Sequence, residues 1–189
     1  MSTPRKPDPA QPVLSVLSSR WEEFWPGLLP ELRCIFGPED FVSELFDFTE
    51  TGYYDRELGV PIRRRILGFE PLADPQRLID FKLATNELEA GRVRNGARLF
   101  NLDPGLVFPE RLVLATGKNF THRIYLGRGI WADLTLIYER GAWRTLPWTY
   151  PDYACERVQG ILGELRERCK SKLRSLKHAE NEGLDREPG

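Results

Sequence analysis

Polar side chains repeat along one narrow face of a helix predicted over residues 75–90. At about 100° per residue, Lys82, Thr85, Asn86 and Glu89 project as one stripe with apolar residues on both sides of it. A surface helix normally has a single polar arc, but this helix has a second one on the opposite side, so the stripe is expected to face the interior or a cleft. Two interpretations stay open. The stripe forms an internal network of paired side chains, or it forms one wall of a ligand site in which Lys82 binds an anion and Glu89 acts as a base.

A predicted β-hairpin with a Gly-Arg-Gly loop at 127–129 supplies a second group of candidates. Pairing across this loop places Arg123 opposite Asp133 and Tyr125 opposite Trp131. Directly opposed side chains lie about 5 Å apart, close enough for an ion pair. This face of the hairpin is a candidate site, although a solvated cross-strand pair would give the same pattern. The other face is apolar and is expected to pack in the core.

Lys118 lies just before this hairpin, and His122 lies at its start. A histidine titrates nearest to neutral pH, so His122 and Glu89 are the candidates for general acid–base chemistry if the protein is an enzyme. A structural role for His122 is the alternative. The segment around Lys118 lacks the leading glycine and the Ser or Thr that a phosphate-binding Walker loop requires, so Lys118 is expected to contact an anion only as an isolated charge.

Two prolines fix an extended backbone in the segment Leu146-Pro147-Trp148-Thr149-Tyr150-Pro151-Asp152-Tyr153. Trp148 and Tyr150 are therefore presented rigidly, either as the wall of a pocket or as a plug at the edge of the core. Asp152 is a candidate ligand residue, and the alternative is that it caps the N-terminus of a final helix.

The pattern of predicted elements indicates an α+β fold. The order strand–helix–strand–strand–helix–strand over residues 12–102 is that of a ferredoxin-like split βαβ core, and a three-stranded antiparallel meander and a final helix follow it. Asp103-Pro104-Gly105 is expected to form a turn that ends the last strand of this core. The predicted strands and helices cover residues 12–18, 20–37 (broken or kinked by prolines), 41–48, 62–69, 75–90, 97–102, 122–126, 130–138, 143–146 and 152–176.

Length and composition place the elements in one domain. The chain has 189 residues, 27 basic and 28 acidic, and a net charge of −1, which excludes a wholly basic nucleic-acid coat protein. Three cysteines without a C-x-x-C pair predict neither a disulfide framework nor a structural metal site. Without a predicted signal sequence or membrane span, cytoplasmic localisation is expected. A disordered Pro-rich arm (1–11), a single α+β domain (12–176) and a flexible charged tail (177–189) are predicted.

The chain resembles a bacterial family called domain of unknown function 4416 over roughly residues 11–170. The resemblance rests on the motifs Asn101-Leu102-Asp103-Pro104-Gly105, Leu112-Val113-Leu114-Ala115-Thr116, His122-Arg123-Ile124-Tyr125-Leu126, Gly129-Ile130, Thr135-Leu136-Ile137-Tyr138 and the run 146–153, with Asp47-Phe48-Thr49, Tyr53-Tyr54 and 82–89 upstream. It implies a stand-alone cytoplasmic protein without an established activity. Some members of the family carry a GTP-binding label, but this sequence has neither a Walker motif nor the N-K-x-D guanine-reading motif. Asp133 stands where many relatives are expected to have Glu.

These observations predict a polar pocket between the helix stripe and the meander that binds a small anionic ligand, phosphorylated or nucleotide-like. The alternatives are a non-enzymatic protein or RNA interaction module and a GTP-binding protein without a Walker motif; nucleic acid is the less favoured partner. The residues leave the cofactor unknown, and Asp103, Glu89 or Asp133 could hold a divalent cation through their oxygens. The predicted ligand-binding residues are Lys82, Thr85, Asn86, Asn101, Asp103, Lys118, Arg123, Tyr125, Asp133, Trp148, Tyr150 and Asp152, beside His122 and Glu89 as acid–base candidates.

Overall fold

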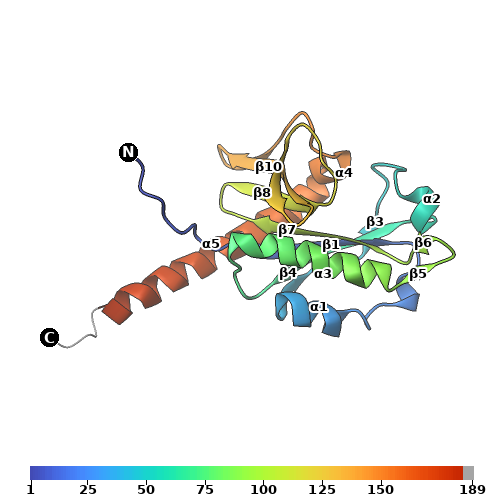
Figure 1. Cartoon of the computed structure of the whole chain (residues 1–189), viewed down its shortest axis with the longest axis horizontal. Coiled ribbons are helices and arrows are strands. Elements are labelled where there is room, and N and C mark those ends of the chain that lie inside the picture. The colour runs from blue at the N-terminus through green and yellow to red at the C-terminus, as the bar shows by residue number, and fades with distance from the viewer. Residues whose placement is uncertain (185–189) are drawn as a thin grey trace.

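The computed structural model describes residues 1–184 and shows an α+β fold (Figure 1). The strands are β1 (Gln11–Ser18), β2 (Glu39–Val42), β3 (Phe46–Asp47), β4 (Arg63–Phe69), β5 (Val93–Arg94), β6 (Ala97–Arg98), β7 (Asn101–Val107), β8 (Arg111–Thr116), β9 (Arg123–Gly127), β10 (Ile130–Glu139) and β11 (Ala142–Thr145). The helices are α1 (Leu29–Phe36), α2 (Asp55–Leu58), α3 (Leu78–Ala90), α4 (Pro151–Ala154) and α5 (Glu156–Leu184), with short 3-10 turns at Trp21–Glu23 and Pro75–Arg77.

Nine strands form one antiparallel sheet in the order β11-β10-β8-β7-β1-β4-β2. β3 pairs with β4, and β9 pairs with β10, while β5 and β6 form a separate small hairpin. The three strands of the predicted meander are β9, β10 and β11, but they do not form a meander. β8 occupies one edge of β10, so β9 and β11 both pair with the other edge, β9 with its first half and β11 with its second half.

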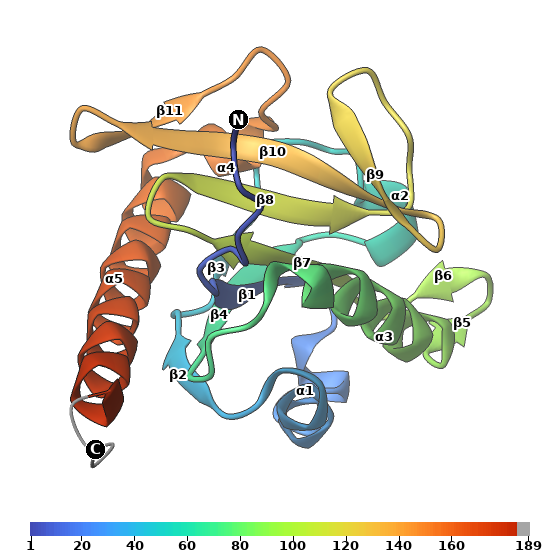
Figure 2. The ribbon, with the colours of Figure 1, turned by 60° about the vertical axis from the view of Figure 1, so that its left-hand side comes forward.

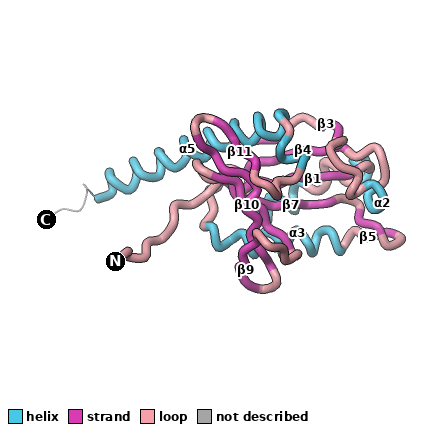
Figure 3. Tube along the Cα trace, turned by 90° about the horizontal axis from the view of Figure 1, so that it is seen from above, coloured by secondary structure: helices cyan, strands magenta, loops and turns pink. Residues whose placement is uncertain are grey.

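Helices cover both faces of this sheet. α1 and α3 lie on one face (Figure 2), where Phe36 stacks between Phe69 of β4 and Phe81 of α3. On the other face, Leu162 and Leu165 of α5 pack in a second apolar cluster. Figure 3 shows that α5 continues well beyond the sheet, and its end at Leu184 lies past the predicted end of this helix near residue 176. Residues 185–189 of the predicted flexible tail lie outside the described residues.

The start of the central helix follows the prediction closely. The Asp74 carboxylate accepts a hydrogen bond from the Gln76 backbone N–H at 3.0 Å, and Pro75 occupies the first turn, where its missing N–H has no cost. The helix then runs as α3 to Ala90, before Gly91, as predicted. Prolines also divide the helix predicted over 20–37, which is a 3-10 turn followed by α1.

The prediction that Asp103-Pro104-Gly105 forms a turn is wrong, because β7 runs straight through these residues. β7 pairs with β1 along its whole length but with β8 only from Gly105 onward. The N–H of Leu102 points away from β1. Backbone N–H groups two residues apart in a strand point to the same edge, so the nitrogen of Pro104 also lies on the edge that is not paired with β1. A proline is tolerated there because no hydrogen bond from its nitrogen is required.

Gly105→Ala is expected to lower the free energy of unfolding by about 1–3 kcal/mol, because it overpacks the β7–β8 contact. A Cβ at this position would lie 2.7 Å from Leu114 Cδ2 and 2.9 Å from the Val113 carbonyl oxygen. Urea denaturation measures the loss. Gly117→Ala is the control, since a Cβ at Gly117 would meet nothing within 4 Å. Equal stabilities of the two variants would contradict this account of β7.

Candidate functional site

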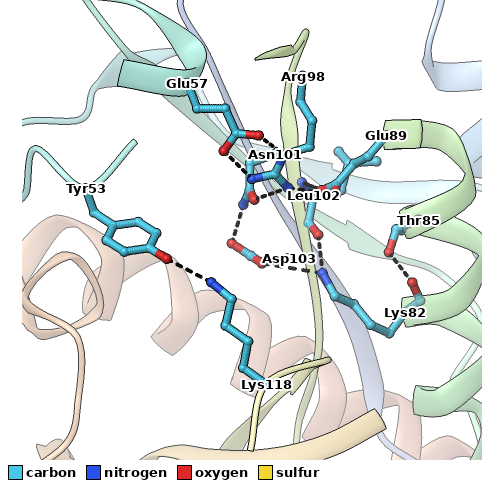
Figure 4. A network of polar contacts seen from close by, with 10 residues as sticks. All are labelled: Tyr53, Glu57, Lys82, Thr85, Glu89, Arg98, Asn101, Leu102, Asp103 and Lys118. Carbon is cyan, nitrogen blue, oxygen red and sulfur yellow. Dashed lines mark hydrogen bonds and ion pairs between the residues drawn. The ribbon is translucent and has the colours of Figure 1, made fainter. Parts of the chain in front are cut away.

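Two side chains of α3 replace a strand partner at the unpaired edge of β7. Glu89 Oε1 accepts the Leu102 N–H at 2.5 Å, and Lys82 Nζ donates to the Leu102 carbonyl oxygen at 3.0 Å (Figure 4). A buried backbone N–H or C=O without a partner costs about 1–3 kcal/mol. The polar stripe therefore faces inward, as predicted. Its Lys82 and Glu89 side chains hydrogen-bond the backbone of β7 where β8 does not pair with it.

The remaining charge on Glu89 is paired with the β5–β6 hairpin. Glu89 Oε2 lies 2.8 Å from Arg98 Nη1, and Arg98 also forms a two-pronged ion pair with Glu57 of α2, at 2.5 and 2.8 Å. Burial raises the pKa of Glu89, although Lys82 and Arg98 oppose that rise. The hydrogen bonds from Arg98 lower the pKa of Glu57. The network thus joins α2, α3, β6 and β7 through charged contacts.

The other predicted residues of this region have different surroundings. The Thr85 hydroxyl donates to the Lys82 carbonyl oxygen at 3.0 Å, within the helix. Asp103 is partly exposed, with Oδ1 3.7 Å from Lys82 Nζ and Oδ2 2.5 Å from Asn101 Nδ2. Asn86 is half-buried, and its side chain makes no hydrogen bond with the described residues.

The hairpin holds a second cluster around a buried carboxylate. Asp133 Oδ2 accepts from Arg123 Nε at 2.9 Å and lies 3.1 Å from His122 Nε2. The structure confirms two predicted cross-strand pairs, Arg123 with Asp133 and Tyr125 with Trp131. The predicted pairing of Leu126 with Ile130 is wrong, because Ile130 pairs with Gly127 and the register shifts between Ile130 and Trp131. A hydrogen bond between an ionised carboxylate and the His122 ring has Nε2 as its donor, because an ionised carboxylate can only accept.

Arg123 connects this cluster to the aromatic segment that follows β11. Its Nη2 donates to the Tyr150 hydroxyl at 2.7 Å, and its Nη1 donates to the Lys118 carbonyl oxygen at 2.9 Å. Trp148 stacks on His122 with ring centroids 4.8 Å apart, and its indole N–H donates to the Leu134 carbonyl oxygen. Trp148 and Tyr150 are therefore held rigidly at the surface, and neither plugs the core.

Lys118 lies between the two clusters. Its side chain is exposed, and Nζ lies 2.8 Å from the Tyr53 hydroxyl and 5.3 Å from the centroid of that ring (Figure 4). Tyr53 was not among the predicted site residues, because its hydrogen bond with Lys118 joins residues 65 positions apart in the chain. The signal available in the sequence was a pair of adjacent tyrosines in an otherwise acidic segment.

Asp152 belongs to a buried ion pair. It is not a helix cap, because its carboxylate lies 2.9 Å from Arg64 Nη1 and makes no capping hydrogen bond. The Arg64 side chain is 1% exposed, donates to the Ser15 hydroxyl at 2.9 Å and lies over the Tyr153 ring. Burial raises the pKa of both Asp152 and Tyr153. Arg64 was also missed, although its position in a strand places it on the opposite face from Arg63 and Arg65.

Tyr125 and Ile124 are the remaining hairpin positions with a predicted role, and only Ile124 departs from its prediction. Tyr125 packs on Trp131, with ring centroids 5.0 Å apart, and its hydroxyl accepts from the Gly129 N–H, so its polar contacts stay within the hairpin. Ile124, expected in the core, is exposed, because β9 lies at the margin of the sheet, where no described element covers this side chain.

Two cavities of the molecule lie away from the predicted site residues. One of about 340 Å³ lies beside the β5–β6 hairpin, and one of about 690 Å³ lies between the start of α3 and the β9–β10 loop. No predicted site residue lines either of them. Among the side chains of residues 1–179, no three His, Cys, Asp or Glu are grouped closely enough to hold a metal ion. None of the described helices is long and apolar enough to span a membrane.

Comparison with known proteins gives one match. Neither the curated proteins nor the solved structures searched contain a match to the chain. The family model described as Domain of unknown function (DUF4416) matches residues 8–169, a span from just before β1 into α5 that includes the residues of both polar clusters. The chain therefore belongs to this family of unknown function.

Proposed function

We propose that the protein binds a small anionic, nucleotide-like ligand at the surface around Lys118. The Lys118 cluster is a set of residues linked one to the next by direct contacts: Tyr53, Lys118, Phe120, His122, Arg123, Trp148 and Tyr150. Within it the Lys118 ammonium contacts Tyr53, and the Lys118 backbone carbonyl accepts from Arg123. The observation that carries the proposal is that this set combines an exposed lysine ammonium with four aromatic rings that are 36% to 66% exposed. Folded proteins normally bury rings of this size, and a group of exposed ones indicates a binding surface.

The ammonium of Lys118 has room for a ligand oxygen. An ammonium group carries three donors, and in the described part of the chain Lys118 Nζ has the Tyr53 hydroxyl as its hydrogen-bond partner. Two donors are left for a phosphate or carboxylate. The Arg123 guanidinium contributes positive charge nearby, and Asp133, Tyr150 and the Lys118 carbonyl already fix its position.

The exposed rings suit a planar group next to that anion. Tyr53, Phe120, Trp148 and Tyr150 come from three separate segments, and each has a free face or edge at the surface. Stacking of a base on an aromatic ring is worth about 1–3 kcal/mol and tolerates any base. A nucleotide combines such a ring with a phosphate, so it matches both features of the cluster.

The buried stripe has a different role in this proposal. Lys82 and Glu89 hold the unpaired end of β7, and their charges are met by protein groups, so we assign them to the scaffold behind the ligand. Of the two interpretations of the polar stripe, this assignment favours an internal network of paired side chains over one wall of a ligand site.

Lys118→Ala is expected to weaken nucleotide binding at least about tenfold, since a hydrogen bond to a charged group contributes about 1.5–3 kcal/mol. Isothermal titration calorimetry with AMP, GMP and inorganic phosphate measures the change. Lys170→Ala is the control, because Lys170 is a surface lysine of α5 paired with Glu167. If no probe binds the wild-type chain, or if the two variants bind equally, the proposal is wrong.

We also propose that the first half of the sheet is a ferredoxin-like core. The neighbouring strands β7-β1-β4-β2 are all antiparallel, and α1 and α3 both contribute to the apolar cluster on one face. This order supports a split βαβ arrangement in which β1, β2, β4 and β7 are the four core strands.

A further inference from the structure

Three consecutive apolar side chains are exposed on an edge strand. β9 pairs with β10 along one edge, and no strand among residues 1–184 pairs with its other edge. Ile124, Tyr125 and Leu126 are all exposed, and Ile124 is 70% exposed. Natural edge strands normally carry lysines, prolines or bulges that discourage association, and the centre of β9 carries none on its free edge.

We propose that β9 pairs with β9 of a second copy of the chain, antiparallel, so that two sheets join across a twofold axis. Pairing of this kind satisfies the free backbone groups of both edges and buries the apolar side chains of both copies. Figure 2 shows β9 at the margin of the sheet, away from α5. The proposal does not depend on nucleotide binding, because Ile124, Tyr125 and Leu126 lie outside the Lys118 cluster.

Two copies of β9 have matching side chains in one antiparallel register. Directly opposed residues of an antiparallel pair point to the same face, so even positions can pair only with even positions. A pair centred on Tyr125 places Tyr125 opposite Tyr125 of the partner subunit, and Ile124 opposite Leu126 of the partner subunit. All three apolar side chains then have apolar neighbours.

The same register avoids repulsion between like charges. It places Arg123 opposite Gly127 of the partner subunit, which has no side chain to meet it. The Arg123 guanidinium is also turned toward Asp133 and Tyr150 of its own chain. Arg128, just beyond β9, is paired with Asp80 at 2.7 Å. The edge therefore presents no uncompensated positive charge to its copy.

The exposed apolar side chains supply a little over half of the area that a specific dimer needs. Ile124, Tyr125 and Leu126 expose together roughly 350 Å² in each copy, or about 700 Å² in a pair, against the roughly 1,200 Å² at which specific interfaces begin. The paired backbone of β9 and the hairpin loop next to it add to this area. We assign the free edge of β9 to a second copy of the chain, because a second copy supplies an identical edge strand with the same apolar side chains.

Light scattering coupled to size-exclusion chromatography tests the proposal across a concentration series. The wild-type chain is expected to have twice the 21.8 kDa mass of one copy. Ile124→Lys is expected to be monomeric, whereas Val60→Lys, at a position that is 69% exposed far along the chain, is expected to remain dimeric. A wild-type chain that is monomeric throughout, or an Ile124→Lys variant that is still dimeric, would overturn the proposal.

Cysteine cross-linking tests the register. In a Cys34→Ser background, which removes the exposed native thiol, Tyr125→Cys is expected to form a disulfide-linked dimer on oxidation. Ile124→Cys is expected to cross-link poorly, because its neighbour across the axis is Leu126 of the partner subunit. The opposite order of cross-linking would show that the strands do not pair around Tyr125.

Discussion

Glu89→Ala is expected to lower the free energy of unfolding by about 3–5 kcal/mol, a large part of the stability of a domain. The substitution leaves the Leu102 N–H without an acceptor and leaves Lys82 and Arg98 with one carboxylate fewer in a buried network. It also frees the end of β7 that β8 does not cover. Urea denaturation followed by tryptophan fluorescence measures the loss.

Glu87→Ala is the matched control for this variant. Glu87 lies on the exposed side of the same helix, so its loss is expected to change the stability by less than about 0.5 kcal/mol. If Glu89→Ala were as stable as Glu87→Ala, water would be satisfying the edge of β7, and the scaffold role of the stripe would be wrong.

Arg64→Met is expected to be similarly destabilising, by about 3–5 kcal/mol, because it leaves the Asp152 carboxylate buried without its cation. Arg64 joins β4 to β1 through Ser15 and to α4 through Asp152, and its guanidinium lies 4.4 Å from the centroid of the Tyr153 ring. Since α4 directly follows Tyr150, the variant is also expected to loosen the aromatic side of the Lys118 cluster.

Two further variants separate the ion pair from the loss of side-chain volume. Arg63→Met changes a neighbouring, partly exposed arginine of the same strand and is expected to have little effect. Asp152→Asn in the Arg64→Met background removes the orphaned charge and is expected to restore part of the lost stability. If the double variant were no more stable than Arg64→Met alone, the buried charge would not be the cause.

Local signals in the sequence were sufficient for several elements. Asp74 and Pro75 specify the start of the central helix by capping chemistry within a few residues. The glycines at 127 and 129 predicted a hairpin and the Arg123–Asp133 pair correctly, although Gly127 pairs with Ile130 and the register shifts beside the loop. The inward direction of Lys82 and Glu89 followed from helical periodicity alone.

Contacts between distant segments could not be predicted in the same way. Asp103-Pro104-Gly105 has the composition of a turn, but β1 pairs with these residues from nearly ninety positions away and keeps them extended. Lys82 and Glu89 were ambiguous because their partners lie on the backbone of β7, which carries no signal of residue type. Arg64 and Asp152, 88 positions apart, are individually ordinary surface residue types until the fold buries them together.

Binding of a nucleotide-like anion by the Lys118 cluster can be observed residue by residue in a nuclear magnetic resonance titration of ¹⁵N-labelled protein with AMP. Saturable shifts are expected for the Lys118, Phe120 and Arg123 amides and for the Trp148 indole N–H, and Lys118→Ala is expected to move the midpoint of the remaining shifts to at least about tenfold higher AMP. Unchanged spectra at saturating AMP would contradict binding by this cluster. Shifts confined to the 690 Å³ cavity beside Leu126 and Arg128 would contradict it equally.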